Sequence, residues 1–454
     1  MSSLPQQSHS VTSGGDFDPV TSEIRRLARL SPRPTTIEQT GLSLTFLTDL
    51  LGKQLASAGV LTTSQIIDRL ALAGPIIDQV LQFMRADGRV EVRSRLGLDG
   101  ELRYGLTDRG RLEAVDATNR GGYVGPAPVP LADYVALVNK QSVHGRVVTR
   151  QAVRDAFRGF VIADDLLDRL GPALNSRRAM FLYGSAGTGK TFTARRLASA
   201  LEGLVLIPHA ISVNETVIEV FDPLCHEQMA FMNPPSPTML EQGFDPRYVP
   251  CERPIVFTGG ELAADMLEVQ CDTATRTYSG PIQLKANNGF LLIDDLGRQR
   301  IEPAVLFNRW IVPLDTRHDS LTTGKGHHFE VPFDLVLVFS TNLRPEDIAD
   351  EAFLRRLGYK IEFTPISAGL YTRIWRDVCT ERSVALDPHL VEFAISELHG
   401  KRGIPMLPCH PRDLLGMALD RIAYMGTGTL DRSALTWAWD SYFLHRGANE
   451  YRDV

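Results

Sequence analysis

The segment Gly184-Ser-Ala-Gly-Thr-Gly-Lys-Thr191 has the residue types and the spacing of a phosphate-binding loop. The apolar run before it, residues 179–183, predicts a buried strand, and residues 192–201 after it predict a helix. In such a loop, backbone N–H groups converge on phosphate oxygens at the positive end of a helix. Lys190 would reach the β- and γ-phosphates, and the Thr191 hydroxyl would bind Mg²⁺, so we interpret the segment as an ATP site. The residues expected to cradle the phosphates are Gly184, Ser185, Ala186, Gly187, Thr188 and Gly189.

A second strand is predicted to carry the carboxylates that such a site needs. Residues 289–296 read Gly-Phe-Leu-Leu-Ile-Asp-Asp-Leu, a buried strand that ends in two acids. We expect Asp294 to hold the Mg²⁺ shell and Asp295 to polarise the attacking water. Many ATPases of this type carry Glu at the second position. The side chain of Asp295 is one methylene shorter, so the water must lie closer or the strand must shift.

The next apolar strand, residues 335–339, leads into Ser-Thr-Asn at 340–342. An amide between this strand and the acid pair could hold the γ-phosphate and the lytic water, and Asn342 is our candidate. The strand order of an open parallel sheet places it beside the site. The alternative is a helix cap, because Pro345-Glu-Asp follows.

Three arginines are candidates for contacting the nucleotide. Arg355 and Arg356 are adjacent, and an arginine there can act on the γ-phosphate of a neighbouring subunit. Arg356 is the first candidate and Arg355 the second; the alternative for both is a solvated surface charge. Arg412 lies in the first turn of a helix that begins at His410-Pro411 and can reach back over the nucleotide.

These five elements, in this order, resemble the AAA+ ATPases over residues 131–446. The resemblance implies an α/β core, a helical lid at about 367–446, and a ring, most often hexameric, with ATP bound between subunits. Residues 280–289 and a possible β-hairpin at 321–331 look like the MoxR and magnesium-chelatase side of the superfamily. Residues 170–176, 308–314, 329–333 and 352–356 look like bacterial ATPases described as chaperone-like.

The elements that position these residues suggest several domains. Residues 1–36 are rich in Ser, Gln, Pro and Gly, and predict a disordered arm. Residues 38–118 predict three helices, a β-hairpin with an Asp-Gly turn and a closing helix, a pattern that looks like a winged helix. A Pro/Gly linker at 119–130 would lead to the α/β core at 131–366 and the lid at 367–446. Within the core, residues 208–288 contain stretches that read as an irregular insertion.

A winged helix can bind DNA or dock a protein. The third predicted helix presents two carboxylates among five polar residues, which is a poor face for a phosphate-lined groove. The hairpin is more basic, with Arg89, Arg93, Arg95 and Arg103. We therefore favour protein docking or regulation over DNA binding.

Composition limits the remaining possibilities. The chain has 454 residues and a net charge of -6, which argues against nonspecific nucleic-acid binding by the whole chain. Its five cysteines include no C-x-x-C pair, so we expect a reduced, cytoplasmic setting; a metal at Cys225, His226 and Cys251 is the less favoured alternative. We expect no signal peptide and no membrane span.

We therefore predict a cytoplasmic, homo-oligomeric ring ATPase that uses ATP and Mg²⁺ to remodel an unknown protein partner. One alternative is a DNA-associated ATPase of the transposition, loader or transcription type that grips DNA through residues 38–118. The acid pair followed by Leu-Gly also resembles helicase-loader ATPases. A third possibility, suggested by Asp295, is an ATP-gated switch that binds ATP but hydrolyses it slowly.

Overall fold

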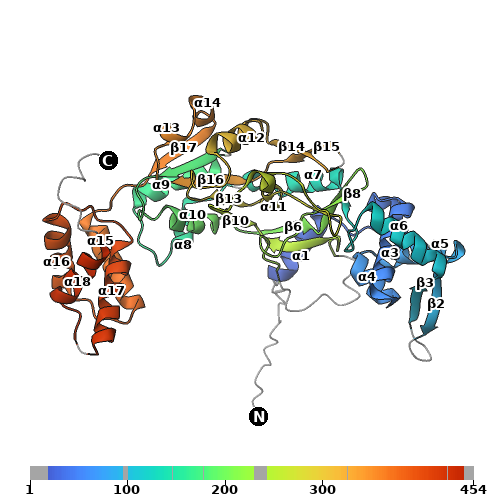
Figure 1. Ribbon diagram of the computed structural model, residues 1–454, viewed down its shortest axis with the longest axis horizontal. Helices are drawn as coiled ribbons and strands as arrows, with labels where there is room; N and C mark the ends of the chain where they lie inside the picture. The colour runs from blue at the N-terminus through green and yellow to red at the C-terminus, as the bar shows by residue number, and fades with distance from the viewer. Residues whose placement is uncertain are drawn as a thin grey trace, which may run out of the picture. The chain divides into compact units, whose positions relative to one another are not determined.

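The computed structural model describes residues 19–95, 101–145, 147–176, 178–229, 243–324, 326–426 and 428–443. These residues divide into two compact units that interleave along the chain (Figure 1). The first unit spans Met1–Lys140, Leu204–Val217 and Gln228–Cys251, and the second spans Gln141–Gly203, Ile218–Glu227 and Glu252–Val454. The helix α7 (Leu131–Lys140), which we expected to open the ATPase core, therefore belongs to the first unit.

The helices and hairpin expected for residues 38–118 are present in the first unit. Thr62 begins the second helix with a reciprocal capping box to Gln65, and Thr107 caps the closing helix. The strands pair antiparallel in the order β1-β3-β2, and the predicted Asp-Gly turn lies outside the described residues. The bounds are α2 Ile37–Thr40, α3 Leu44–Ala58, β1 Val60–Thr62, α4 Thr63–Leu70, α5 Gly74–Ala86, β2 Val90–Arg95, β3 Leu102–Leu106 and α6 Asp108–Arg120.

Two predictions about the first unit are corrected. Residues 1–18 of the expected disordered arm lie outside the described residues, but Pro19–Leu30 form helix α1, with Leu27 fully buried. Arg26 of this helix donates to the carbonyl of Leu204 at 2.7 Å. The expected linker at 119–130 is also packed, because Ala127 is fully buried and its N–H donates to the carbonyl of Leu70 at 2.8 Å. Both segments are held by contacts that local composition does not reveal.

A buried ion pair joins distant segments of the first unit. Arg247 makes a salt bridge to Asp245 at 2.7 Å, and both side chains are 3% exposed. The same guanidinium donates to the carbonyls of Thr40 and Pro128. A buried charge of this kind is tolerable only when partners satisfy it, so Arg247 ties residues 245–247 to the helical part of the unit. The other elements of this unit are β4 Val129–Pro130, β6 Leu204–Pro208, β7 Ala210–Val213 and, as far as Cys251, β9 Tyr248–Glu252.

The second unit contains a parallel sheet in the order β10-β13-β16-β5-β17. Its edge strand, Ile255–Thr258, lies within residues 208–288, so that segment is not only an insertion. The residues from Tyr248 to Pro250, predicted to be irregular, lie in strand β9. The sheet strands are β5 Ala179–Tyr183, β10 Ile255–Thr258, β13 Phe290–Ile293, β16 Val336–Thr341 and β17 Leu357–Glu362.

Helices cover both faces of this sheet, because successive strand residues point to opposite sides. In β13, Leu291 and Ile293 pack in one core with Trp310 of α12, while Phe290 and Leu292 pack in another with helices α8, α9 and α10. Figure 1 shows the sheet between these helices. The bounds are α8 Arg150–Ala156, α9 Asp164–Asn175, α10 Lys190–Ala198, α12 Pro303–Thr316, α13 Pro345–Ile348 and α14 Glu351–Leu354.

Short elements and one hairpin complete the α/β part. The hairpin expected at 321–331 is present as two antiparallel strands, His318–Thr322 and His328–Pro332. Its buried Asp319 forms a salt bridge with Arg309 of α12 at 2.6 Å. The remaining elements are η1 Val143–Gly145, β8 Thr216–Glu219, η3 Ala264–Leu267, β11 Gln270–Asp272, β12 Thr277–Ser279, α11 Ile282–Lys285, β14 His318–Thr322 and β15 His328–Pro332.

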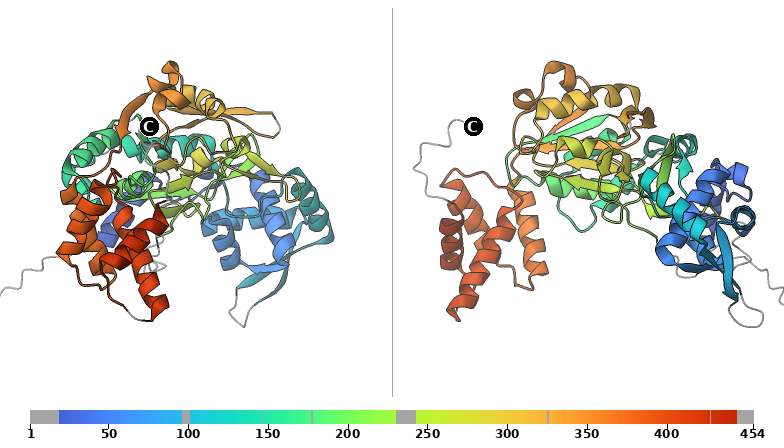
Figure 2. Two further views of the ribbon diagram at one scale, coloured as in Figure 1. Left: turned by 60° about the vertical axis from the view of Figure 1, so that its left-hand side comes forward. Right: turned by 45° about the vertical axis from the view of Figure 1, so that its right-hand side comes forward.

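The C-terminal helices form a lid with its own core (orange to red in Figure 2). Trp439 and Tyr371 are fully buried in it, and Tyr371 donates to His399 at 2.8 Å. The bounds are α15 Ala368–Glu381, α16 Pro388–Phe393, the π-helix η4 Ala394–Gly400, α17 His410–Met425 and α18 Arg432–Tyr442. The predicted α/β class is confirmed, with a parallel sheet between helices and a separate helical C-terminal part. Among the described helices, none is both long and apolar enough to cross a bilayer.

Candidate nucleotide site

The phosphate-binding loop connects the end of β5 to the start of α10, as predicted. Gly184, Gly187 and Gly189 all have positive φ angles, of 137°, 81° and 89°, which L side chains rarely adopt. A Cβ on Gly184 would lie 2.3 Å from the carbonyl oxygen of Phe363, so only glycine fits there. The sequence folds into this loop because its glycines supply backbone conformations that place N–H groups at the start of a helix.

Lys190 lies at the centre of the site and is 6% exposed. Its ammonium donates to the carbonyls of Gly184 at 2.8 Å and Ser185 at 2.9 Å, and to the amide oxygen of Asn342 at 2.8 Å. Burial lowers the pKa of Lys190, while the charges of Asp294 and Asp295 oppose that shift. All three hydrogen-bond acceptors are neutral, so no carboxylate neutralises this cation directly.

The two expected magnesium ligands lie in contact with each other. The Thr191 hydroxyl donates to Oδ1 of Asp294 at 3.0 Å, although the two residues come from α10 and from the end of β13. Carboxylate and hydroxyl oxygens are suitable ligands for Mg²⁺, which binds through a few protein oxygens together with phosphates. These two residues therefore fit a magnesium ion that also contacts a nucleotide.

Asp295 lies on a tightly held loop after β13. Its φ angle is 49°, which is uncommon for a residue other than glycine, although Asp tolerates it better than most. Gln299 fixes the loop, since its amide group donates to the carbonyls of Asp294 at 2.8 Å and Asp295 at 3.2 Å. Leu296 anchors the same loop to β16, with its N–H donating to the carbonyl of Ser340 at 2.8 Å.

Lys190, Thr191, Asp295 and Asn342 line a cavity of about 1000 Å³ in the second unit. From the α/β part, its lining residues are Gly159, Phe160, Val161, Ala186, Gly187, Gly189, Lys190, Thr191, Phe192, Asp295, Arg298 and Asn342. From the lid, they are Ile374, Asp377, Val378, Thr380, Glu381, Pro408, Cys409, Arg412 and Asp413. The volume matches pockets that enclose small organic ligands, at the upper end of their usual range of roughly 300–1,000 Å³.

The structure separates the three predicted arginines. Arg412 lines the cavity, where it forms a salt bridge with Glu381 at 2.9 Å. Arg356 and Arg355 do not line the cavity. Arg356 is held by Asp315 at 2.8 Å, and Arg355 by Glu351 at 2.6 Å. The chain's own site therefore brings together the phosphate loop, Asp294, Asp295, Asn342 and Arg412, without Arg355 or Arg356.

Several lining residues were not foreseen from the sequence. Cys409 of the lid is one of them, and it lies so close to the loop that a Cβ on Gly187 would be 2.6 Å from its Sγ. Phe160 and Phe192 pack edge to face with ring centroids 5.1 Å apart, and both line the cavity. Arg298 comes three residues after Asp295, on a turn through Leu296 and Gly297 that local sequence patterns do not reveal.

The possible metal group at Cys225, His226 and Cys251 is not supported. His226 has its two ring nitrogens bonded to the N–H of Asp222 and to the carbonyl of Lys285. Burial raises the pKa of Cys251 to about 12. No cluster of His, Cys, Asp and Glu that could hold a metal occurs among the described residues.

Comparisons with known proteins give limited information. A family model described as "Domain of unknown function (DUF8689)" matches residues 367–441, which is the lid. The search for similar curated proteins found no significant match.

Among solved structures, the chain is similar to the Thermotoga maritima RuvB Holliday junction branch migration motor, with 14% identity and a TM-score of 0.35 over 62% of this chain and 70% of that one. It is also similar to NtrX from Brucella abortus, with 12% identity and a TM-score of 0.36 over 71% of this chain and 64% of that one.

Proposed function

We propose that this protein is a ring-forming AAA+ ATPase that binds and hydrolyses Mg-ATP to remodel a protein partner. The observation that supports this best is the convergence of four polar groups from three separate segments. Lys190 contacts Asn342, and Thr191 contacts Asp294, beside a cavity large enough for a nucleotide. In an open parallel sheet, ligands bind outside the carboxyl ends of the strands, and β13 and β16 both end here.

The chain's own groups can perform the steps of hydrolysis. The loop N–H groups and Lys190 would bind the phosphates, and Thr191 with Asp294 would hold a magnesium ion, whose charge would offset the negative charge that develops on the phosphates. Asp295 accepts a hydrogen bond from the attacking water and orients it, and Asn342 positions that water against the γ-phosphate. The lid residue Arg412 would break its salt bridge with Glu381 and bind a phosphate oxygen of the nucleotide instead.

The test measures ATP binding and hydrolysis by the purified full-length Lys190→Ala variant and compares them with those of the wild type. We expect turnover to fall by about 10²–10³ or more, the usual effect of removing one group that stabilises developing charge. Lys360→Ala is a matched control, because Lys360 lies outside the cavity and its ammonium bonds, among the described residues, only to the carbonyl of Leu357. Hydrolysis that survives Lys190→Ala unchanged would show that another protein or another site is responsible.

The ring is supported by the location of Arg356 outside its own chain's cavity. Arg356 would exchange its partner Asp315 for the γ-phosphate bound by a neighbouring subunit, which would complete the site in trans. Inactive Lys190→Ala and inactive Arg356→Ala proteins, once mixed, should recover part of the activity, because some interfaces then contain an intact Lys190 and an intact Arg356. Full activity of Arg356→Ala alone would rule out that role and shift attention to Arg355.

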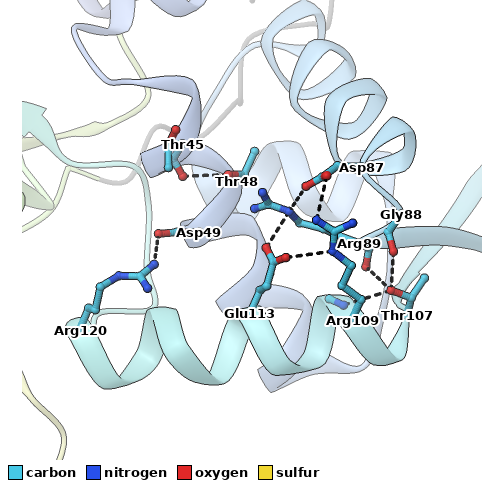
Figure 3. A network of polar contacts seen from close by, with 11 residues as sticks. Thr45, Thr48, Asp49, Asp87, Gly88, Arg89, Thr107, Arg109, Glu113 and Arg120 are labelled. Atoms are coloured by element: carbon cyan, nitrogen blue, oxygen red, sulfur yellow. Dashed lines mark hydrogen bonds and ion pairs between the residues drawn. The ribbon is translucent and has the colours of Figure 1, made fainter.

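Residues 38–118, the winged-helix-like part of the first unit, are proposed to be an adaptor or regulatory module for the protein partner. DNA binding through residues 38–118 is the less favoured alternative, because several arginines that could contact DNA phosphates already form salt bridges with carboxylates. Figure 3 shows Arg89 and Arg109 paired with Asp87 and Glu113. Arg93, Arg111 and Arg120 also have carboxylate partners. Salt-dependent binding of duplex DNA by the full-length protein would favour the alternative, and no binding at low salt would discard it.

A further inference from the structure

We propose that Arg298 binds the terminal phosphate of ATP in its own chain's site. This inference rests on the ATPase function proposed above and adds a residue that the phosphate loop, acid pair and arginine candidates do not include. Arg298 lines the nucleotide cavity together with Lys190, Asp295 and Asn342. Its side chain forms no ion pair with the other residues that the structure describes.

The charge balance of the cavity indicates where a further cation is needed. Three cations line it, and they face four carboxylates. Three of these carboxylates, Asp377, Glu381 and Asp413, come from the lid helices α15 and α17. The lid cation, Arg412, is already bound to one of them. On the α/β side, Lys190 and Arg298 line the cavity with Asp295, and the nearby Asp294 bonds to Thr191 where the magnesium ion would bind, so this is the end of the cavity that suits a polyanion with its metal.

The backbone fixes Arg298 beside the acid pair. The N–H of Arg298 donates to the carbonyl of Asp295 at 3.0 Å, which closes a turn with Leu296 and Gly297 at its centre. Gly297 has a φ angle of 103°, the positive value that the third position of a type II turn requires. The first and last Cα atoms of such a turn lie less than about 7 Å apart.

The turn is also rigid. Leu296 is 2% exposed, its N–H bonds to Ser340, and its carbonyl accepts the hydroxyl of Thr341 at 2.8 Å. Gln299 binds the other side, because its side-chain oxygen accepts the N–H of Gly297 at 2.8 Å. A cation on a backbone fixed at both ends has only its side chain left to order when a phosphate binds, and a charge held near its target before reaction is what stabilises a transition state. Arg298 and Asp295 would thus present a cation and a carboxylate to the same phosphate from one turn.

The experiment compares Arg298→Ala, Arg298→Lys and the matched control Arg300→Ala in the full-length protein. Arg300 is an exposed arginine two residues further on that does not line the cavity. Equilibrium binding of ADP and of a non-hydrolysable ATP analogue is measured together with steady-state hydrolysis. We expect Arg298→Ala to weaken binding of the ATP analogue by about ten- to hundredfold, the usual effect of a lost hydrogen bond to a charged group, and to leave ADP binding unchanged. Arg298→Lys should recover part of the loss, and Arg300→Ala should match the wild type.

Other results would overturn the inference in separable ways. Equal weakening of ADP and ATP-analogue binding would place Arg298 away from the terminal phosphate. Unchanged binding and hydrolysis in Arg298→Ala, with Lys190→Ala inactive, would refute the role of Arg298 and leave the ATPase function standing. A wild-type protein that binds neither nucleotide would refute both. Recovery of activity on mixing Arg298→Ala with Lys190→Ala would show that Arg298 serves a neighbouring subunit instead of its own.

Discussion

The lysine of the nucleotide site and two arginines of the first unit have opposite environments. Lys190 is almost fully buried, yet its hydrogen-bond acceptors are two backbone carbonyls and the Asn342 amide, none of which carries a charge. Arg89 and Arg109 of the first unit are more exposed, and both are bound to the carboxylates of Asp87 and Glu113 (Figure 3). A buried cation without a carboxylate partner is costly and persists where an anionic ligand will complete it. A network of exposed pairs instead stabilises the fold modestly.

The largest effect that tests this comparison is expected at Asp295. Asp295→Asn should lower turnover by about 10²–10⁴ and leave ATP binding intact, because it removes the group that polarises water. Asn is the suitable replacement, since it tolerates the positive φ angle of 49° at this position. Steady-state hydrolysis and nucleotide binding are measured in parallel, with Asp377→Asn as a control from the lid side of the cavity.

Turnover within threefold of the wild type would mean that Asp295 does not act on the water. Asp295→Glu adds a finer distinction. A glutamate variant that hydrolyses ATP faster than the wild type would favour the ATP-gated switch, and an unchanged or slower variant would favour the motor.

A buried histidine extends the comparison to a group that has neither a ligand nor a carboxylate partner. His410 of the lid is 3% exposed, with its ring stacked 5.2 Å from that of His399, and burial lowers its pKa from 6.5 to about 4. The unfolded chain then binds more protons than the folded one between pH 6.5 and 4. Stability is therefore full above pH 6.5 and falls as the pH drops toward 4, by roughly 3 kcal/mol from this group.

The measurement is the free energy of unfolding in urea at several pH values across that window. His410→Gln should show a shallower loss of stability than the wild type, and His389→Gln, which changes an exposed histidine, should follow the wild type. Identical slopes for all three proteins would mean that other groups account for the acid sensitivity of the lid.

The smallest effect is expected in the network of Figure 3. Glu113→Gln removes the carboxylate that binds both Arg89 and Arg109, and should lower the free energy of unfolding by about 1 kcal/mol or less. ATP hydrolysis should not change, and Glu91→Gln, which breaks a single exposed pair, should cost still less. A tenfold drop in hydrolysis in Glu113→Gln would mean that the network around Arg89 and Arg109 affects hydrolysis as well as stability, which would contradict the contrast drawn with Lys190.

The sequence predicted the parts of the site that depend on local order along the chain. A strand, a glycine loop and a helix must follow one another, so Lys190 and Thr191 could be located, and the ends of two further apolar strands located Asp294 and Asn342. Arg298 was missed because its position depends on the turn at Gly297 and on the anchoring of Leu296, neither of which has a recognisable local pattern.

The first unit was harder to predict, because its packing joins segments that are distant in sequence. The polar composition of residues 1–36 suggested disorder, yet Arg26 bonds to Leu204 and the N–H of Asp245 bonds to Ser31. The proline- and glycine-rich residues 119–130 suggested a linker, yet Arg247 holds the carbonyl of Pro128. Local propensity carries no information about such partners, so helix and strand positions were foreseen and their assembly was not.

The buried pair of Arg247 and Asp245 has a consequence for how the protein is made. A chain emerges from the ribosome in sequence order, and domains tend to fold as they appear. The first unit needs Arg247 to satisfy the carbonyls of Thr40 and Pro128, and its last segment ends at Cys251. By the time that segment is synthesised, the phosphate loop has already been made. The first unit therefore cannot finish folding until residue 251 has been made, and a fragment cut after residue 130 would lack the side chains that hold it together.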